Sequence, residues 1–345
     1  MRETVAWVDP WREPGKLVER LMKFSARQTE KPILFYEGDW DLLLVSRFRE
    51  SLASAFRFVV ADSQLVENLV DKARFVQLAR KLELPVPPAQ HLSFTNGARP
   101  QDLQLRFPVV VKPLTRQRET WRPIAVEGTA QEPKAVRVRD IHEMRDLWPL
   151  LARSELDVLV QELIPGPESR IESWHAYVDE TGEVVGSFTG RKIRTLPAAY
   201  GYSSALEITS SAEVASLGAD LMKRLGLTGV VKIDFKRDER GRLYLLEVNP
   251  RFNLWHHPGA VAGINLPALV YSDLTGITRP SVTEAKVGVQ WCRYRRDVRA
   301  ARAARIPFLR WLVWSLSCEA KSPSPFDDPM PIIRGVVWSS IRGNR

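Results

Sequence analysis

The chain contains very little cysteine. Only Cys292 and Cys318 occur among its 345 residues, and their spacing fits neither a zinc site nor a disulfide framework. Small extracellular domains often depend on disulfides, so this scarcity favours a reducing compartment. We therefore expect a cytoplasmic protein.

Long apolar runs are also missing. No segment approaches the roughly 20 apolar residues that a membrane-spanning helix needs. The opening residues Met1–Val5 lack a secretory pattern, and the chain has no internal repeat. With 44% hydrophobic and 26% charged residues, the composition is that of a globular protein with room for two or three packed units.

Basic residues outnumber acidic ones, and the net charge is +9. This excess raises the question of an anionic partner. No zinc pattern or aromatic RNA-binding signature accompanies it, so we expect no specific nucleic-acid binding. A solvated basic helix is the favoured interpretation of the C-terminal arginines, with an acidic substrate carrier or a membrane surface as alternatives. These residues are Arg293, Arg295, Arg296, Arg299, Arg302, Arg305 and Arg310.

Strand and helix patterns alternate at the start of the chain. Residues 32–39 predict a buried strand with helical spacing on both sides, and Arg57–Val60 predicts another. This alternation predicts a small α/β unit with a parallel sheet. A helix over Asp71–Ala79 follows, and Leu84–Pro88 marks a boundary because proline ends helices.

The central part predicts further strands and helices. The polar stretch 116–133 predicts a flexible loop, and Gly226 is the residue type that a helix C-cap favours. The expected strands are Phe107–Pro113, Lys134–Val138 and Asp157–Gln161, with a hairpin from Ile171–Tyr177 to Glu183–Thr189; the expected helices are Asp140–Leu151 and Ala212–Leu225.

A Trp- and Leu-rich segment near the C-terminus, Ile306–Leu316, predicts another helix. Its residues Phe308, Leu309, Leu312 and Leu316 fall on one helical face. We favour an amphipathic helix that packs this face against the protein. A helix lying in a membrane interface is the alternative.

Two apolar runs carry acidic and amide side chains. Val231–Phe235 contains Asp234, and Leu245–Arg251 contains Glu247 and Asn249. The pattern predicts a β-hairpin with Glu247 and Asn249 on one face. Three oxygen donors suit Mg²⁺ held together with nucleotide phosphates. An ordinary hairpin with a charged solvent side is the alternative, but the flanking apolar residues favour a metal–nucleotide site.

The order of these motifs resembles the ATP-grasp superfamily and, within it, the carboxylate–amine ligases. The similarity covers about residues 71–274, from the lysine strand Val110–Pro113 through Val160–Glu168 to the acidic hairpin. It implies an α/β (α+β) fold in which two α+β subdomains clasp ATP. The expected domains are 1–70, a shortened N-terminal α/β unit; 71–275, the ATP-grasp domain, with a nucleotide-binding part at about 107–165 and a metal-binding part at about 166–275; and 276–345, a basic, Trp-rich helical extension.

The resemblance also implies roles for individual residues. The segment Val160–Glu168 resembles the adenine hinge of the family, so backbone groups from Glu162 to Ile164 would pair with adenine and Glu168 would receive the ribose hydroxyls. The loop before Lys134 would close over the phosphates. The expected ATP contacts are Lys112, Lys134, Gln161, Glu162, Leu163, Ile164 and Glu168. The expected ligands of two Mg²⁺ ions, which Mn²⁺ would replace, are Asp234, Glu247 and Asn249.

Catalytic and substrate residues are expected close to that hairpin. Arg251 and Lys232 would stabilise the transferred phosphate. The substrate region would include Arg191, Lys192, His256 and His257. For Arg191 and Lys192, a solvated pair outside the site is an equal alternative. For His256 and His257, a structural role is an equal alternative.

The implied activity is an ATP- and Mg²⁺-dependent ligase that joins a carboxylate to an amine through an acyl phosphate. No Ser–His–Asp or Cys–His arrangement competes with it. An ATP-binding protein without turnover is the alternative, and a basic nucleic-acid-binding protein a weaker one. Small-molecule acids and amines are the expected partners; a homodimer stays open.

Three strings resemble the D-aspartate-ligase-like group, namely Ser187–Lys192, Asp71–Phe75 and Phe326–Pro331. The chain departs from the family pattern at its start. It has no glycine-rich turn before Ile33, so the N-terminal unit looks short by a strand–helix–strand piece. Either the start of the sequence is placed late or this unit is reduced. Because that unit often contributes to the acceptor site, the departure weakens inference about the substrate.

Overall fold

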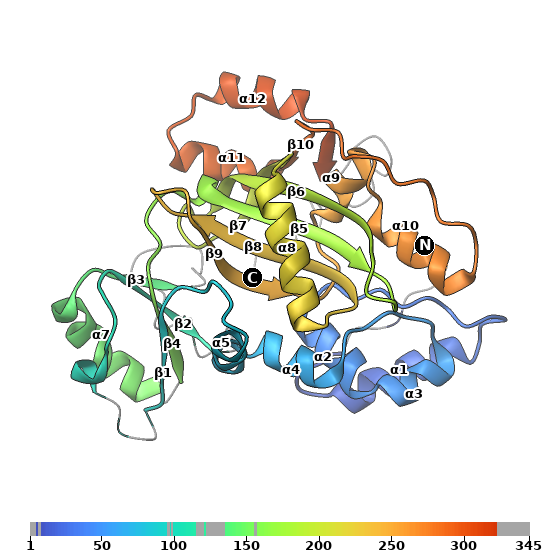
Figure 1. Ribbon diagram of the computed structural model, residues 1–345, viewed down its shortest axis with the longest axis horizontal. Helices are drawn as coiled ribbons and strands as arrows, with labels where there is room; N and C mark the ends of the chain where they lie inside the picture. The colour runs from blue at the N-terminus through green and yellow to red at the C-terminus, as the bar shows by residue number, and fades with distance from the viewer. Residues whose placement is uncertain are drawn as a thin grey trace, which may run out of the picture.

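Two sheets of unequal size organise the molecule. The structure is a computed structural model that describes residues 5, 8–94, 97, 99–114, 121, 135–154 and 157–322. Figure 1 shows the smaller sheet beside the larger one, with the N-terminal helices along the bottom of the view and C-terminal helices along the top.

The N-terminal part is helical, and the parallel sheet expected there is wrong. Its two expected strands reduce to one parallel bridge between Ile33 and Arg57. A helix follows directly after the expected first strand, as predicted, and its start is capped because the Asp41 carboxylate accepts the Gly38 amide at 2.9 Å. Buried Leu42 and Leu52 then join the core beneath the large sheet. The helices are α1 (Pro14–Ser25), α2 (Asp39–Arg47), α3 (Arg49–Ala55), α4 (Ser63–Val70) and α5 (Lys72–Lys81).

The smaller sheet has the order β1-β4-β2-β3, and every neighbouring pair is antiparallel. Alternation along β2 buries Val109 and Val111 beside Met144 of α7, and turns Val110 and Lys112 toward a cleft. The elements are β1 (Ala89–Leu92), η1 (Pro100–Asp102), β2 (Val109–Pro113), β3 (Val136–Val138), α7 (Ile141–Ser154) and β4 (Val158–Glu162).

The larger sheet has the order β11-β10-β7-β6-β5-β8-β9. All its pairs are antiparallel except β10–β11. The helix α8 (Ala212–Leu225) crosses one face (Figure 1). The elements are η2 (Glu168–Arg170), β5 (Ile171–Val178), β6 (Val184–Leu196), β7 (Tyr202–Thr209), β8 (Gly229–Arg237), β9 (Leu243–Asn249), β10 (Gln290–Arg293) and β11 (Ala320–Ser322).

Local sequence signals account well for this central part. The hairpin β5–β6 and the helix α8 lie where the sequence predicts them. Gly226 ends α8 with a φ of 59°, the left-handed conformation that glycine tolerates. Within α8, a Cβ atom on Gly218 would lie 2.5 Å from the Trp174 ring, so only glycine allows the helix to approach the sheet so closely.

The described residues of the C-terminal part, up to Ser322, include two strands of the large sheet in addition to helices. Its strands β10 and β11 form one edge of that sheet, because Trp291 pairs with Leu206 on one side and with Ala320 on the other. The helices that precede and join these strands are α9 (His256–Val261), α10 (Leu266–Thr275), α11 (Tyr294–Ala303) and α12 (Phe308–Ser317).

The buried face of α12 differs from the expected one. Phe308, Leu309 and Leu316 are exposed, whereas Trp311 is buried. The Trp311 indole donates to the buried Asp297 carboxylate at 2.9 Å, and this bond fixes the rotation of the helix. Among the described residues, none of the helices combines the length and the apolar character needed to cross a membrane.

Candidate functional site

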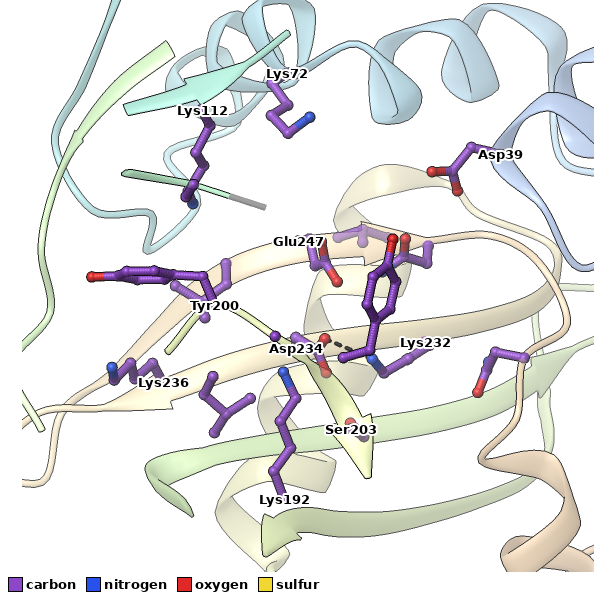
Figure 2. A pocket seen from close by; sticks show the side chains of 18 of the residues that line it. Asp39, Lys72, Lys112, Lys192, Tyr200, Ser203, Lys232, Asp234, Lys236 and Glu247 are labelled. Atoms are coloured by element: carbon purple, nitrogen blue, oxygen red, sulfur yellow. Dashed lines mark hydrogen bonds and ion pairs between the residues drawn. The ribbon is translucent and has the colours of Figure 1, made fainter. Parts of the chain in front are cut away.

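One cleft of about 910 Å³ separates the two sheets. Small-molecule sites have volumes of about 300–1,000 Å³, so this cleft is large enough for a nucleotide and a second ligand. Figure 2 shows Lys112 and Lys72 on the upper wall, with Lys192, Lys232 and Asp234 on the wall formed by the large sheet.

The hairpin β8–β9 forms the polar centre of that lower wall. Asp234 lies directly opposite Glu247, and Lys232 lies opposite Asn249. An irregularity in pairing after Asp234 places Leu246 beside the cleft as well. Two carboxylates, an amide and an amine therefore come from adjacent positions of two paired strands.

Asp234 is a buried carboxylate with two partners. Only 2% of it is exposed. The Lys232 ammonium lies 2.6 Å away, and the Ser173 hydroxyl donates to the other carboxylate oxygen. These contacts offset the cost of removing a charge from water. Figure 2 shows the Lys192 amine also directed toward Asp234.

The donor set of this hairpin fits a hard cation. Asp234, Glu247 and Asn249 supply only oxygen donors, as Mg²⁺ prefers. No group of three or more His, Cys, Asp or Glu side chains suited to a metal occurs within the described ranges. The hairpin thus offers two carboxylates and one amide to a metal ion. The remaining coordination positions would be filled by phosphate oxygens and water, as in nucleotide–magnesium sites.

The wall opposite the hairpin presents a desolvated lysine. The Lys112 ammonium donates to Gln161 Oε1 at 2.7 Å. Burial lowers the pKa of Lys112, while the charges of Glu247 and Glu168 oppose that change. Across the cleft, Lys236 lies 3.7 Å from Glu168, and burial likewise lowers the pKa of Lys236. Both lysines are positioned to gain from an anionic ligand.

The end of β4 and the segment after it line the same end of the cleft. Gln161, Glu162, Leu163, Ile164 and Glu168 all contribute to its wall. The amides of Glu162 and Leu163 already donate to the carbonyl oxygens of Pro88 and Pro108. The Glu162 carboxylate pairs with Arg106. The third amide expected to bind adenine is that of Ile164. Among the described residues this amide has no hydrogen-bond acceptor, so it could donate to a ligand.

The structure separates the four expected substrate residues. Lys192 lines the cleft, but its neighbour Arg191 lies on the opposite face of β6 and pairs with Glu207 at 3.2 Å. Successive residues of a strand point to opposite faces, so placing both in the cleft was wrong.

Neither expected histidine lines the cleft. His256 lies 5.6 Å from the Phe252 ring and is buried, and its Nε2 lies 3.2 Å from the Asn253 amide nitrogen. His257 is exposed and contacts Ser322 at 3.4 Å. Both belong to the start of α9, and neither is among the residues that line the cleft. Their place in the acceptor region stays a prediction, and the burial of His256 favours the structural alternative for that residue.

Other expectations lie outside the described residues. These are Lys134, most of the stretch 116–133, and the segment Phe326–Pro331.

Arg251 connects the hairpin to the N-terminal part. Its guanidinium forms an ion pair with Asp39 and donates to the Glu37 carbonyl at 2.8 Å. Glu37 and Asp39 line the cleft. The N-terminal part therefore reaches the site although its sheet is reduced to a single bridge.

Several cleft residues were not predicted from the sequence. Lys236 could have been found, because it is two residues after Asp234 and so shares its face of β8. Asp39 carries no such local signal, because tertiary pairing brings it to Arg251. The same holds for Ser173, which contacts Asp234 from outside the lining of the cleft.

Solved structures of other proteins share this arrangement. Biotin carboxylase from Campylobacter jejuni matches 81% of this chain and 62% of its own, with a TM-score of 0.60 at 16% identity. L-amino acid ligase from Bacillus licheniformis matches 77% of this chain and 61% of its own, with a TM-score of 0.58 at 15% identity. The fold is that of the ATP-grasp proteins.

Sequence comparisons lead to the same class. Residues 154–294 match the family described as "ATP-grasp in the biosynthetic pathway with Ter operon". D-aspartate ligase of Enterococcus faecium is 25% identical over 258 residues, which cover 71% of this chain and 59% of that protein. D-alanine–D-alanine ligase of Pseudomonas putida (strain GB-1) is 26% identical over 223 residues, covering 59% and 63%.

The chain has the ATP-grasp fold and is similar in sequence to D-aspartate ligase and D-alanine–D-alanine ligase. It spans about three fifths of the length of the curated relatives that it matches, 59% and 63% for these two.

Proposed function

We propose that this protein is an ATP- and Mg²⁺-dependent ligase that activates a carboxylate as an acyl phosphate for attack by an amine. The observation that carries the proposal is the rung of Asp234 and Glu247, which faces Lys112 across one cleft. The parts at about 107–165 and 166–275 would clasp the nucleotide between them.

The nucleotide would lie between Lys112 and the hairpin. Lys112 and Lys236 would meet its phosphates as point charges, which would restore the charge stabilisation that burial takes from both. The amide of Ile164 would pair with the adenine edge, and Glu168 would accept from the ribose hydroxyls.

Asp234, Glu247 and Asn249 would hold two Mg²⁺ ions, which Mn²⁺ would replace because it accepts the same oxygen ligands. When bound, the ions supply charge neutralisation of the phosphates. Before the ions bind, the Lys232 ammonium neutralises the charge of the Asp234 carboxylate. Lys232 would then turn from this carboxylate toward the γ-phosphate.

The reaction that suits this site needs little covalent chemistry from the enzyme. A substrate carboxylate oxygen attacks the γ-phosphorus, and the bond to the β-phosphate oxygen breaks to give ADP. The amine then attacks the acyl carbon, loses a proton and releases phosphate. Lys232, Lys192 and Arg251 would stabilise the charge that develops. The strands that hold the two lysines, and the Asp39 ion pair that holds Arg251, would preorganise these groups.

One observation favours a second candidate, an ATP-binding protein without turnover. Lys232 and Asp39 already pair with Asp234 and Arg251. If these pairs persist when ATP binds, the groups expected at the γ-phosphate stay occupied. The two candidates differ in whether a carboxylate stimulates ADP formation.

The test supplies the protein with ATP, Mg²⁺, hydroxylamine and a panel of carboxylic acids. Hydroxylamine is a small amine that converts an acyl phosphate into a hydroxamate. We expect at least one acid to give ADP and hydroxamate in equal amounts. ATP binding without acid-stimulated ADP formation would instead support the second candidate.

A further inference from the structure

A second positive patch closes the cleft at the edge of the large sheet. Arg293 is the last residue of β10, and Arg296 lies in the first turn of α11. Both line the same cleft as Lys232 and Asp234. None of the ATP and metal roles proposed above uses these two arginines.

Their strand connects them to the reacting end of the cleft. Trp291, two residues before Arg293, lies opposite Leu206, and Leu206 lies opposite Lys192. All three line the cleft. Trp291 and Leu206 therefore form an apolar stretch of the cleft wall between the arginines and Lys192. Lys192 is the lysine directed toward Asp234.

Arg296 is held in place by its surroundings. It donates to the Leu196 carbonyl at 3.1 Å, and its guanidinium lies 4.8 Å from the centre of the Tyr202 ring. The neighbouring Asp297 carboxylate is directed elsewhere, because it accepts from Arg194 at 2.6 Å and from Ser204 at 2.8 Å. Asp297 anchors α11 without neutralising Arg296.

The two arginines have no acidic partner within the described part of the chain. No ion pair of Arg293 or Arg296 with a carboxylate occurs there. Burial, and then the charge of Arg293, lowers the pKa of Arg296. Two like charges on a cleft wall form a site that an anion would stabilise. The planar guanidinium groups suit the two oxygens of a carboxylate or a phosphate.

Resting on the proposed function, we propose that Arg293 and Arg296 bind a second acidic group of the carboxylic acid substrate. The substrate class is then an acid with a carboxylate or phosphate at its far end. An uncharged middle part would lie along Leu206 and Trp291.

Strand order indicates that this substrate is extended. Four strand spacings separate β10 from β8, which at about 4.8 Å each amount to about 19 Å across the sheet. The long side chains of the arginines and lysines shorten the gap but do not close it. An acid whose two acidic groups are several carbons apart fits better than a short diacid.

The test compares acids that differ only at the far end. In the presence of Mg²⁺ and a non-hydrolysable ATP analogue, calorimetry measures the binding of succinate, adipate and suberate against butyrate, hexanoate and octanoate. An ω-phosphonate of suberate length separates a phosphate preference from a carboxylate preference. We expect at least tenfold tighter binding of the longer diacids, or of the phosphonate, than of the monoacid of equal length.

Three variants show whether the arginines cause this preference. R293Q and R296Q should each reduce it at least tenfold and leave the affinity for the ATP analogue unchanged. R299Q is the matched control, because Arg299 is exposed on the same helix and does not line the cleft. Arg293 is itself exposed, so R293Q should fold normally; circular dichroism checks all three proteins.

The outcomes separate this proposal from the ligase function. Equal binding of diacid and monoacid, including no detectable binding of either, would overturn the arginine site. So would an unchanged preference in both R293Q and R296Q. Absence of acid-stimulated ADP formation overturns the ligase function instead, because the binding preference is measured without turnover.

Discussion

The two faces of β8 show how one strand can serve both stability and chemistry. Val231, Ile233 and Phe235 are fully buried on the side of α8. Lys232, Asp234 and Lys236 alternate with them and line the cleft. The apolar face is held by packing, whereas the charged face is stabilised by ion pairs.

That difference decides what each face tolerates. Asp234 can stay buried and charged because Lys232 and Ser173 contact it. Ile233, its neighbour in sequence, contacts only apolar surroundings and contributes through the area it buries. Substitutions on the cleft face should therefore change activity, and those on the other face should change stability.

The largest effect should follow from Glu247→Gln. This change removes one of the two carboxylates of the rung but keeps its shape. We expect acid-stimulated ADP formation to fall by about 10²–10³-fold or more, the scale for loss of one preorganised electrostatic group. A coupled assay for ADP measures the rate, and thermal unfolding by circular dichroism shows whether the fold is intact.

Asp234→Asn provides a second probe of the same rung, since it also keeps the side-chain shape. If Glu247→Gln unfolds the protein, Glu247 has a structural role and the comparison of the two faces fails. Unchanged turnover in a folded Glu247→Gln protein would remove Glu247 from the proposed metal set.

Ile233→Ala tests the opposite face. The side chain is fully buried, so its truncation should lower the free energy of unfolding by about 2–5 kcal/mol. Turnover per folded molecule should stay close to that of the wild type at low temperature. Urea unfolding gives the first quantity, and the ADP assay corrected for the folded fraction gives the second.

Leu150→Ala is a control for Ile233→Ala, because Leu150 is 38% exposed on α7 and should cost little stability. A small stability loss in Ile233→Ala, or a loss of turnover in its folded fraction, would show that the two faces are not independent.

The sequence predicts this hairpin because its signals are local. Alternation along Val231–Phe235 and the positions of Glu247 and Asn249 are enough to place these side chains on particular faces. The same applies to α8, where helical spacing and Gly226 define the element and its end. The resemblance to the ATP-grasp superfamily then followed from the order of such local motifs.

Tertiary contacts decide what the sequence did not predict. The two expected N-terminal strands pair only through the bridge between Ile33 and Arg57, and no local signal shows how far such pairing extends. The rotation of α12 depends on Asp297, a residue outside that helix. The arginines at the edge of the cleft look like part of a solvated basic helix in the sequence, and only strand pairing brings Arg293 to the site.

The smallest expected effect is the change in pH-dependent stability caused by His256→Gln. It extends the comparison to a buried group that has no charged partner. Nδ1 has no hydrogen-bond partner among the described residues. Burial, with smaller contributions from Arg251 and Lys232, lowers the pKa of His256 from 6.5 to about 3. Asp234 is thus buried as a charge, whereas His256 is buried neutral.

This depressed pKa should make the protein sensitive to acid. Between about pH 6.5 and pH 3 the unfolded chain binds a proton at this histidine and the folded protein does not, so stability falls as the pH falls. From pH 7 to pH 5 the loss from His256 should be about 2 kcal/mol. Urea unfolding of the wild type and of His256→Gln at both pH values measures this loss.

The variant should lose less stability than the wild type between pH 7 and pH 5. Burial also lowers the pKa of His175, so part of the pH dependence should remain in both proteins. An identical pH dependence in the two proteins would mean that His256 binds its proton in the folded state, and so is not buried neutral.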